Sequence, residues 1–433
     1  MLFRKLKNKF RSSIVPFFIK LSVALNWPRL TAWILVAVVQ QMNEGGEYSV
    51  LCLRRSVFMD DIQAMIRYSG RIRYFAIERM HFTIILTHFL SKDEQRAITE
   101  NNYHTHPIGL EGKKKYYEYL GQVLPILQKK IGFQAIFSGN FGYVQQQELM
   151  QLCKDSNIPF IVFHKEGLIA GFFEGANEMY QGRKFVGDRL LIYNEKITRA
   201  LLDKVSELTP EKIRLVGVPR LDRYKEPFYI PRRAQIVFFS FYIKNWMPKI
   251  IHDEKKYEAA EERALSFHRW ILNFAKKHPE FDVILKTKAA DFYLEYAKKI
   301  FADPSLLKLP NLTVRNYGDP VELIKQSRAV LGYNSMALIE ALIAGKPIFS
   351  PFFGDLAGPG KAWDYFSNYP ELINYIKTED DLEMLLDLER FTPHDQKLVT
   401  EFVEQFAYRP DGQASFRAEQ EVINVIEEYA NAG

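Results

Sequence analysis

Residues 330–350 constrain the fold of this chain more than any other stretch. Residues 329–332 are apolar and end on a glycine, which predicts a buried strand leading into a tight turn. An apolar helix is expected over residues 336–344, with Gly345 as its C-terminal stop and Pro347 opening the next strand. A short helix between two buried strands is a βαβ unit, which predicts an α/β fold with a parallel sheet.

The start of this helix is a candidate anion site. Asn334 and Ser335 stand where an N-cap belongs. The first backbone N–H groups, from Ser335 through Met336 and Ala337 to about Leu338, lack partners inside the helix and carry the positive end of its dipole, so a phosphate is the natural occupant. Glu340, one turn further, could accept hydrogen bonds from the two hydroxyls of a ribose. The alternative is an ordinary capped helix in which Glu340 is a solvated or packing residue.

Composition excludes several classes of protein. The chain has 433 residues, enough for two or three domains. Its net charge of +6 is concentrated at the beginning, where residues 1–43 contain Lys and Arg but no Asp or Glu. The rest is close to neutral, which argues against a general nucleic-acid binder. Cys52 and Cys153 belong to no metal-ligand spacing, which favours a reducing, cytoplasmic compartment and gives no sign of a metal site.

Residues 1–45 have the pattern of a basic amphipathic helical segment. Apolar residues recur at helical spacing from Leu2 to Leu25, and basic residues fill the gaps, as in helices that lie on an anionic membrane surface. Pro16 would kink such a helix. The apolar run 32–39 is shorter than the roughly 20 residues that span a bilayer. The alternative is that these helices pack on the protein itself or on another subunit.

Residues 46–225 are expected to form a first domain in which strands alternate with helices. Strands are expected over 48–53, 73–77, 82–86, 134–140 and 158–164, and helices over 60–68, 113–131 and 143–156. This alternation predicts a parallel sheet with both faces covered. The glycine-containing turn from Ser138 to Asn140 would let a ligand approach the backbone, which makes these two residues candidates for acceptor binding.

Three other side chains of this region suggest chemistry. His164 and Glu166 follow an apolar strand, and either could serve as a general base. The alternative is a polar turn in which Glu166 pairs with Lys165 or another basic residue. Arg220 is suited to bidentate recognition of phosphate, and the alternative is a structural pair with Asp222.

Residues 226–433 are expected to form a second domain after a proline-rich linker over 226–233. Lys286 ends an expected strand and Lys288 follows closely, so both cations are candidates for phosphate binding. The loop over 351–360, rich in Gly and Pro, could close over a ligand.

Four motifs in order resemble the GT-B glycosyltransferases that build bacterial capsules and other surface polysaccharides. The nucleotide-binding segment is matched by Gly332, Asn334, Ser335, Glu340, Ala341, Gly345 and Pro347. The others lie over residues 212–222, 281–288 and 409–417. Lys288 stands where related enzymes have a histidine, which puts proton transfer from that position in doubt. Many retaining enzymes carry a second glutamate where this chain has Gly332, so the resemblance favours the inverting branch.

The resemblance implies two Rossmann-like domains facing a central cleft, an N-terminal acceptor domain and a C-terminal donor domain, with the final helices crossing back to the first. It implies an inverting, metal-independent glycosyltransferase that moves a sugar from a nucleotide-activated donor to a glycan or lipid-linked acceptor. No cofactor besides the donor substrate and no nucleic-acid partner is expected. The protein would act in the cytoplasm, held peripherally at the inner membrane. The implied donor-binding residues are Arg220, Lys286, Lys288, Asn334, Ser335, Met336, Ala337 and Glu340.

Three alternatives remain open at this point. A sugar-nucleotide epimerase and a polyol-phosphate transferase occur on the same fold, and a catalytically silent GT-B-like protein could act as a scaffold. The donor sugar, its nucleotide, the acceptor and the oligomeric state are not encoded in any of these motifs.

Overall fold

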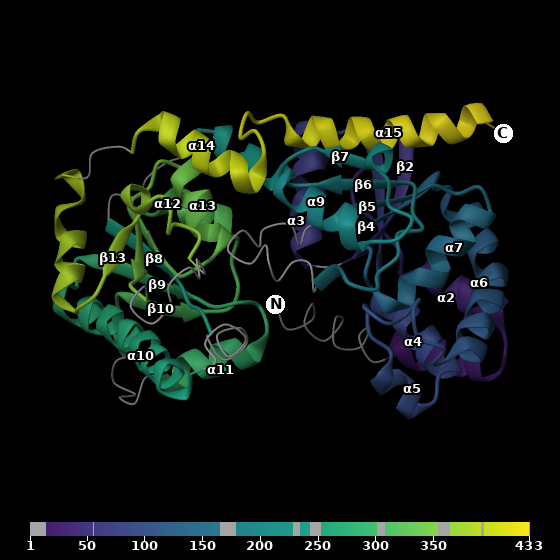
Figure 1. The fold of residues 1–433 in the computed structure, drawn as a ribbon, viewed down its shortest axis with the longest axis horizontal. Helices are drawn as coiled ribbons and strands as arrows, with labels where there is room; N and C mark the ends of the chain where they lie inside the picture. Colours follow the sequence, from purple (N-terminus) through teal and green to yellow (C-terminus); the bar gives the residue numbers. More distant parts are fainter. Residues whose placement is uncertain are drawn as a thin grey trace. The chain divides into compact units, whose positions relative to one another are not determined.

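The computed structural model describes residues 14–54, 56–164, 179–227, 234–242, 253–300, 308–353, 364–390 and 394–432. They form two compact α/β units, drawn in Figure 1. The first contains the described residues up to Asp222 and those from Gln405 onward. The second runs from Arg223 to Glu404. Glu166 and most of the expected loop over 351–360 lie outside the described residues.

The first unit is built on a seven-stranded sheet in the order β1-β3-β2-β4-β5-β6-β7. Only the short edge strand β1 runs antiparallel, against β3. From β3 onward the order follows the 2-1-3-4-5 pattern of flavodoxin-like folds, which places the switch point between β2 and β4. The strands are β1 (Gln40–Gln41), β2 (Tyr48–Arg54), β3 (Ile72–Glu78), β4 (Ala135–Ser138), β5 (Phe160–His164), β6 (Arg189–Ile192) and β7 (Ile213–Leu215).

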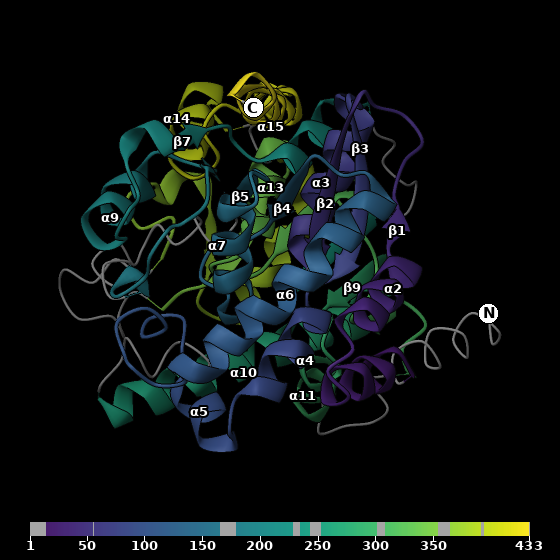
Figure 2. The same cartoon turned by 90° about the vertical axis from the view of Figure 1, so that its right-hand side faces the viewer.

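Helices cover both faces of this sheet, as Figure 2 shows. A first helix occupies residues 14–24. The others are α2 (Pro28–Val38), α3 (Ser56–Tyr68), α4 (Met80–Phe89), α5 (Lys92–Ala97), α6 (Leu110–Ile131), α7 (Gln147–Asp155), α9 (Lys196–Lys204) and α15 (Ala414–Ala432), with short 3-10 helices η1 (Val144–Gln146), η3 (Pro210–Lys212) and η4 (Pro219–Lys225).

Two expectations for this unit were wrong. Residues 82–86, expected as a strand, belong to α4. Its buried residues Phe82, Ile85 and Leu86 recur at the three- and four-residue spacing of a helix and not at the alternation of a strand. The helix expected from residue 60 begins at Ser56, so Asp61 lies inside α3 and not at its start.

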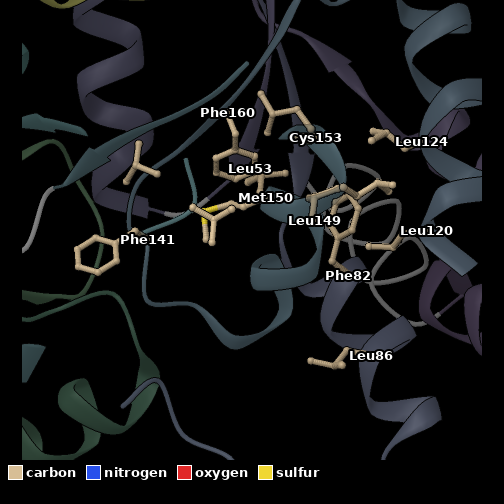
Figure 3. Close-up of a cluster of buried hydrophobic side chains, with 14 of the residues drawn as sticks. Leu53, Phe82, Leu86, Leu120, Leu124, Phe141, Leu149, Met150, Cys153 and Phe160 are labelled. Atoms are coloured by element: carbon tan, nitrogen blue, oxygen red, sulfur yellow. The ribbon is translucent and has the colours of Figure 1, made fainter. Parts of the chain in front are cut away.

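The core of the first unit lies between the sheet and helices α4, α6 and α7. Figure 3 shows Leu53 and Phe160 from two strands among leucines of α4, α6 and α7. Cys153 is buried in this cluster, and burial raises the pKa of its thiol well above the usual value. Cys52 is also buried, and neither cysteine forms a disulfide. Both are packing residues and not reactive thiolates.

The second unit is built on a six-stranded parallel sheet in the order β10-β9-β8-β11-β12-β13. Read in chain order this is 3-2-1-4-5-6, the order of dinucleotide-binding Rossmann folds. The strands are β8 (Ala234–Phe239), β9 (Phe281–Lys286), β10 (Leu312–Arg315), β11 (Ala329–Leu331), β12 (Ile348–Pro351) and β13 (Asn374–Ile376). Its helices are α10 (Glu254–Lys277), α11 (Asp291–Ile300), α12 (Pro320–Gln326), α13 (Met336–Ile343) and α14 (Gln396–Ala407), with 3-10 helices η8 (Pro370–Leu372) and η9 (Asp380–Arg390).

The last segment of the chain departs from the expected domain bounds but follows the return to the first domain that the resemblance implied. Residues 226–433 were expected as one domain, but residues 405–433 belong to the first unit. The reason is a set of contacts made by α15. Glu419 accepts hydrogen bonds from the Tyr74 hydroxyl at 2.6 Å and from the Arg71 backbone N–H at 3.0 Å. Tyr74 lies in β3 and Arg71 directly precedes it, so residues 405–433 complete the first unit.

Candidate functional site

The helix α13 follows β11 through a tight turn and begins at a well-formed cap. Asn334 adopts a left-handed backbone with φ of 39°. Ser335 is the N-cap, and its Oγ accepts the Ala337 N–H at 3.3 Å. At the other end Gly345 has φ of 66°, and the Lys346 N–H donates to the Ala341 carbonyl at 2.9 Å, as in a Schellman stop.

The cap divides the helix N–H groups into two kinds. The Ala337 N–H is taken by Ser335 Oγ, and the Leu338 N–H by the Ser335 carbonyl at 3.0 Å. Within the described part of the chain, the N–H groups of Ser335 and Met336 have no acceptor. Ser335 and Met336 are also partly exposed. These two N–H groups, and not that of Ala337, are therefore the ones positioned to bind an anion.

This helix starts at the switch point of the second sheet. β8 and β11 are parallel neighbours, and the connections from them leave toward opposite faces of a sheet with this strand order. Their carboxyl ends carry Ser240 and the turn that contains Ser335. The Ser240 N–H donates to the Lys286 carbonyl at 2.9 Å, which fixes the end of β9 beside them. Three strand ends thus bring polar groups to one edge.

Ser240 forms a pair with His268 of α10 that the sequence did not reveal. His268 Nδ1 lies 2.7 Å from the Ala264 carbonyl oxygen, which can only accept, so Nδ1 carries a proton. Burial lowers the pKa of His268 to about 4, so the ring is neutral near pH 7. Its Nε2 therefore accepts the Ser240 hydroxyl proton across 2.9 Å. Because the Ser240 hydroxyl proton is donated to His268, Ser240 Oγ can only accept a hydrogen bond from any further group.

The two lysines expected to bind phosphate have different surroundings. Lys286 is buried, and its Nζ donates to the carbonyls of Thr287 at 2.8 Å and Asn316 at 3.3 Å. Its charge therefore ties the end of β9 to the loop after β10. Lys288 is exposed, with its Nζ 5.5 Å from the centroid of the Tyr293 ring. Of the two, Lys288 is the one that a ligand can reach without rearrangement.

Glu340 and Asn334 both hold neighbouring segments in place. Glu340 is only 5% exposed, and its Oε2 accepts the Tyr224 hydroxyl proton at 2.9 Å. Asn334 Oδ1 accepts the backbone N–H of Tyr365 at 3.1 Å. Glu340 therefore ties the segment of Tyr224 to α13, and Asn334 ties the segment of Tyr365 to the turn before it.

The acceptor candidates lie at the switch point of the first sheet, at the carboxyl end of β4. Ser138 is buried, and its hydroxyl donates to Gln146 Oε1 at 2.7 Å. Asn140 is also buried, and its Oδ1 accepts the Gly142 N–H at 2.7 Å. Both side chains serve the internal hydrogen bonding of the turn in this structure.

The remaining candidates also lie in the first unit. His164, at the end of β5, is fully buried, with Nε2 2.7 Å from the Tyr180 hydroxyl. Arg220 pairs with Asp61 at 3.2 Å and donates to the Tyr193 hydroxyl at 3.1 Å. The alternative to phosphate binding was a structural pair of Arg220 with Asp222, and the structure gives Asp61 as the carboxylate partner instead. The position of Asp61 inside α3 explains why the true partner was missed.

Asp222 instead caps α15. Its carboxylate accepts the backbone N–H groups of Ala414 at 3.1 Å and Ser415 at 2.7 Å. From the other side, Arg417 Nε donates to the Val216 carbonyl at 3.0 Å. The two motifs noted over residues 212–222 and 409–417 are therefore joined by hydrogen bonds into one structural assembly.

In the described ranges, no group of three or more His, Cys, Asp or Glu side chains has an arrangement that could hold a metal ion. Among the described helices, none is both long and apolar enough to cross a membrane.

Comparison with known proteins gave matches at the level of structure only. No family model and no curated protein matches the sequence. The wall teichoic acid polymerase TagF, as an H444N variant with CDPG, matches with a TM-score of 0.51 and 13% identity, over 97% of this chain and 98% of that one. The chain has a GT-B-like fold.

Other GT-B proteins match with lower scores. A UDP-GlcNAc 2-epimerase from Methanocaldococcus jannaschii has a TM-score of 0.48 at 10% identity, over 87% of this chain and 99% of that one. The S. aureus protein MnaA, solved with UDP, has a TM-score of 0.48 at 12% identity, over 89% of this chain and 97% of that one. The expected resemblance to GT-B proteins is confirmed, and at these identities it extends to the fold alone.

Proposed function

We propose that this chain is an inverting, metal-independent glycosyltransferase that moves a sugar from a nucleotide-activated donor to a surface-glycan acceptor. The observation that carries the proposal is the meeting of polar groups at the switch point of the second sheet. There the Ser335 and Met336 N–H groups lie at the start of α13, and Ser240 ends the neighbouring strand. A Rossmann sheet binds nucleotides at this edge.

The donor would be held by its phosphates and its ribose. The start of α13 offers two N–H groups, the hydroxyl of Ser335 and the positive end of the helix dipole to the leaving phosphate. Lys288 adds a reachable positive charge. Glu340 would accept from a ribose hydroxyl in addition to its bond from Tyr224. Ser240 Oγ, which can only accept a hydrogen bond, would bind a hydroxyl or amino group of the donor.

The reaction then needs a base and a stabilised leaving group. A base removes the proton of the acceptor hydroxyl, and the oxygen attacks the anomeric carbon from the face opposite the nucleotide. The bond between the anomeric carbon and the phosphate oxygen breaks, and the phosphate keeps the electron pair. Glu166 and His164 are our candidates for the base. His164 could act only after its contact with Tyr180 opens, because its ring is fully buried.

A polyol-phosphate transferase is the second candidate. The supporting observation is the similarity to a wall teichoic acid polymerase over 97% of this chain. In that reaction the acceptor hydroxyl loses its proton to a base and its oxygen attacks the phosphorus that carries the polyol. The bond from that phosphorus to the bridging oxygen of the donor breaks, the nucleoside monophosphate leaves with the electron pair, and the product gains a phosphodiester. The same phosphate site would serve both reactions, so the composition of the product separates them.

The first experiment is a thermal-shift screen of the purified protein with CMP, CDP, UDP, GDP and their sugar and polyol conjugates. A ligand that binds only the folded state raises the free energy of unfolding by about 2.7 kcal/mol when its concentration is a hundred times its dissociation constant. We expect one nucleotide to raise the melting temperature, and a Ser240→Ala and Ser335→Ala double variant to lose most of that shift. Ser266→Ala is the matched control, because Ser266 is a surface residue of α10 that bonds to Glu262.

The donor so identified is then incubated with and without acceptor. A product that gains a sugar and no phosphorus supports the glycosyltransferase, and one that gains phosphorus supports the polyol-phosphate transferase. A changed sugar from donor alone would identify an epimerase. A folded protein that no nucleotide stabilises would indicate a silent scaffold and overturn the proposal.

A further inference from the structure

The helix over residues 14–24 and α2 (Pro28–Val38) bury two hydroxyl residues and expose several large apolar side chains. Ser22 Oγ and Thr31 Oγ1 are 2.6 Å apart, and Thr31 Oγ1 is 2.6 Å from the Tyr119 hydroxyl of α6. Ser22 and Thr31 are fully buried. The outward residues, here named the outer apolar face, are Phe17, Phe18, Leu21, Leu25, Trp27, Leu30 and Trp33.

The outer apolar face exposes more large apolar side chains than any other part of the described chain of similar length. Its side chains are between 39% and 59% exposed. Within the described part of the chain, it holds half of all exposed large apolar side chains, although it covers only 17 residues, 17–33. Exposed large apolar side chains gathered in this way on two consecutive helices mark a surface that binds another molecule.

The inner side shows that these helices are firmly placed. Ile19, Val23, Ala32 and Leu35 are buried in the core of the first unit. The pair is therefore apolar on both sides, a pattern typical of helices that are covered all round. Because the core covers one side and hydrogen bonds to Tyr119 fix the pair, the outer side is presented by a rigid support.

The charges near this face select the kind of partner. Lys20 and Arg29 are exposed beside it, and Lys130 Nζ lies 4.5 Å from the centroid of the Trp33 ring. Residues 1–43 contain no Asp or Glu. A second copy of this face would bring like charges together without an acidic residue of the segment to pair with them. An anionic surface is complementary.

We propose that the outer apolar face binds the surface of an anionic lipid bilayer. Tryptophan rings with a polar N–H favour the boundary between headgroups and acyl chains, where Trp27 and Trp33 would insert. Lys20, Arg29 and Lys130 would contact the negative headgroups. The helices lie in the plane of the membrane and do not cross it. The proposal does not depend on the chemistry at the second sheet.

The test uses the full-length chain and vesicles of phosphatidylcholine with or without phosphatidylglycerol. We expect flotation with the anionic vesicles and a strong loss when salt rises from about 0.1 M to about 1 M, since the Debye length falls from about 10 Å to about 3 Å. Brominated lipids should quench tryptophan fluorescence. A Trp27→Gln and Trp33→Gln double variant should lower the vesicle partition coefficient at least about tenfold.

The matched control replaces two equally exposed apolar residues of the second unit, Phe292→Gln and Leu386→Gln, which are 53% and 44% exposed. This control should bind vesicles as the wild type does. Thermal melting of each variant checks that it is folded. The proposal would be overturned if the wild-type protein does not bind anionic vesicles. It would also be overturned if the tryptophan variant binds them as well as the control does. A change from dimer to monomer in the tryptophan variant, without lipid binding by the wild type, would assign the face to self-association instead.

Discussion

At the scale of the residue, the pair of Ser240 and His268 sets the polarity of the candidate site. Most serines can donate or accept, but the neutral imidazole takes the Ser240 proton, so the site offers a fixed acceptor. Such a residue discriminates between a ligand group that carries a hydrogen and one that does not. The backbone cap at Ser335 has the opposite polarity, since the N–H groups of Ser335 and Met336, which have no acceptor among the described residues, can only donate.

The low pKa of His268 predicts a specific sensitivity to acid. The unfolded chain protonates this imidazole below its usual pKa near 6.5, whereas the folded protein does not until about 4. The folded state therefore binds fewer protons between these values, and the free energy of unfolding falls as the pH drops through this window. The contribution is about 2 kcal/mol between neutral pH and about pH 5.

Urea unfolding at both pH values measures this contribution in the wild type and in His268→Gln. The variant loses packing and the bond to Ser240 at every pH, so only the difference between the two pH values is informative. That difference should be smaller in the variant by about 2 kcal/mol. Equal differences in the two proteins would mean that His268 is protonated in the folded state as readily as in the unfolded chain.

Local signals in the sequence were sufficient for some residues and not for others. Ser335 was predictable as a cap because it lies directly before its own helix. His268 was not, because it reaches Ser240 only after α10 packs on the sheet, 28 positions away. Asp61 was expected only as part of the helix over 60–68, and its pairing with Arg220 crosses 159 positions. Long-range polar pairs of this kind leave no pattern in a single sequence.

At the scale of the element, α6 contains two glycines that should respond in opposite ways to alanine. At Gly121 an added Cβ meets nothing closer than Leu152 Cδ1 at 3.9 Å, so Gly121→Ala should stabilise by about 0.5–1 kcal/mol through helix propensity. At Gly112 the Cβ would lie 2.4 Å from the Phe89 carbonyl oxygen, at the end of α4. There the same substitution should destabilise by about 1–3 kcal/mol.

Thermal or urea unfolding of the two single variants checks this prediction, and each serves as the control of the other. Both changes are made in one helix with one pair of residue types. Stabilisation by Gly112→Ala would mean that α4 and α6 do not approach as closely as described. The expectation for α4 itself failed for a related reason: short apolar runs fit a strand or a buried helix equally well until their packing partners are known.

At the scale of the whole molecule, the alternation of strands and helices was enough to predict the fold class. The expected α/β architecture with parallel sheets is confirmed, and so is the resemblance to GT-B proteins. The strand orders and the contacts of α15 could not be predicted from local pattern, because both depend on which segments meet after collapse. The first unit is consequently made of two stretches of chain separated by the whole second unit.

That discontinuity has a consequence for how the protein is made. A ribosome synthesises residues 223–404 before residues 405–433. The first unit needs this last segment, because Glu419 accepts the Tyr74 hydroxyl proton and Asp222 caps α15. We therefore expect the second unit to fold first during translation, although it begins later in the chain. Stalled nascent chains probed with protease test this order. When residue 404 has left the exit tunnel, the second unit should resist the protease and the first unit should still be cleaved. The first unit should become resistant only after α15 has emerged. Equal protection of both units at the earlier point would contradict it.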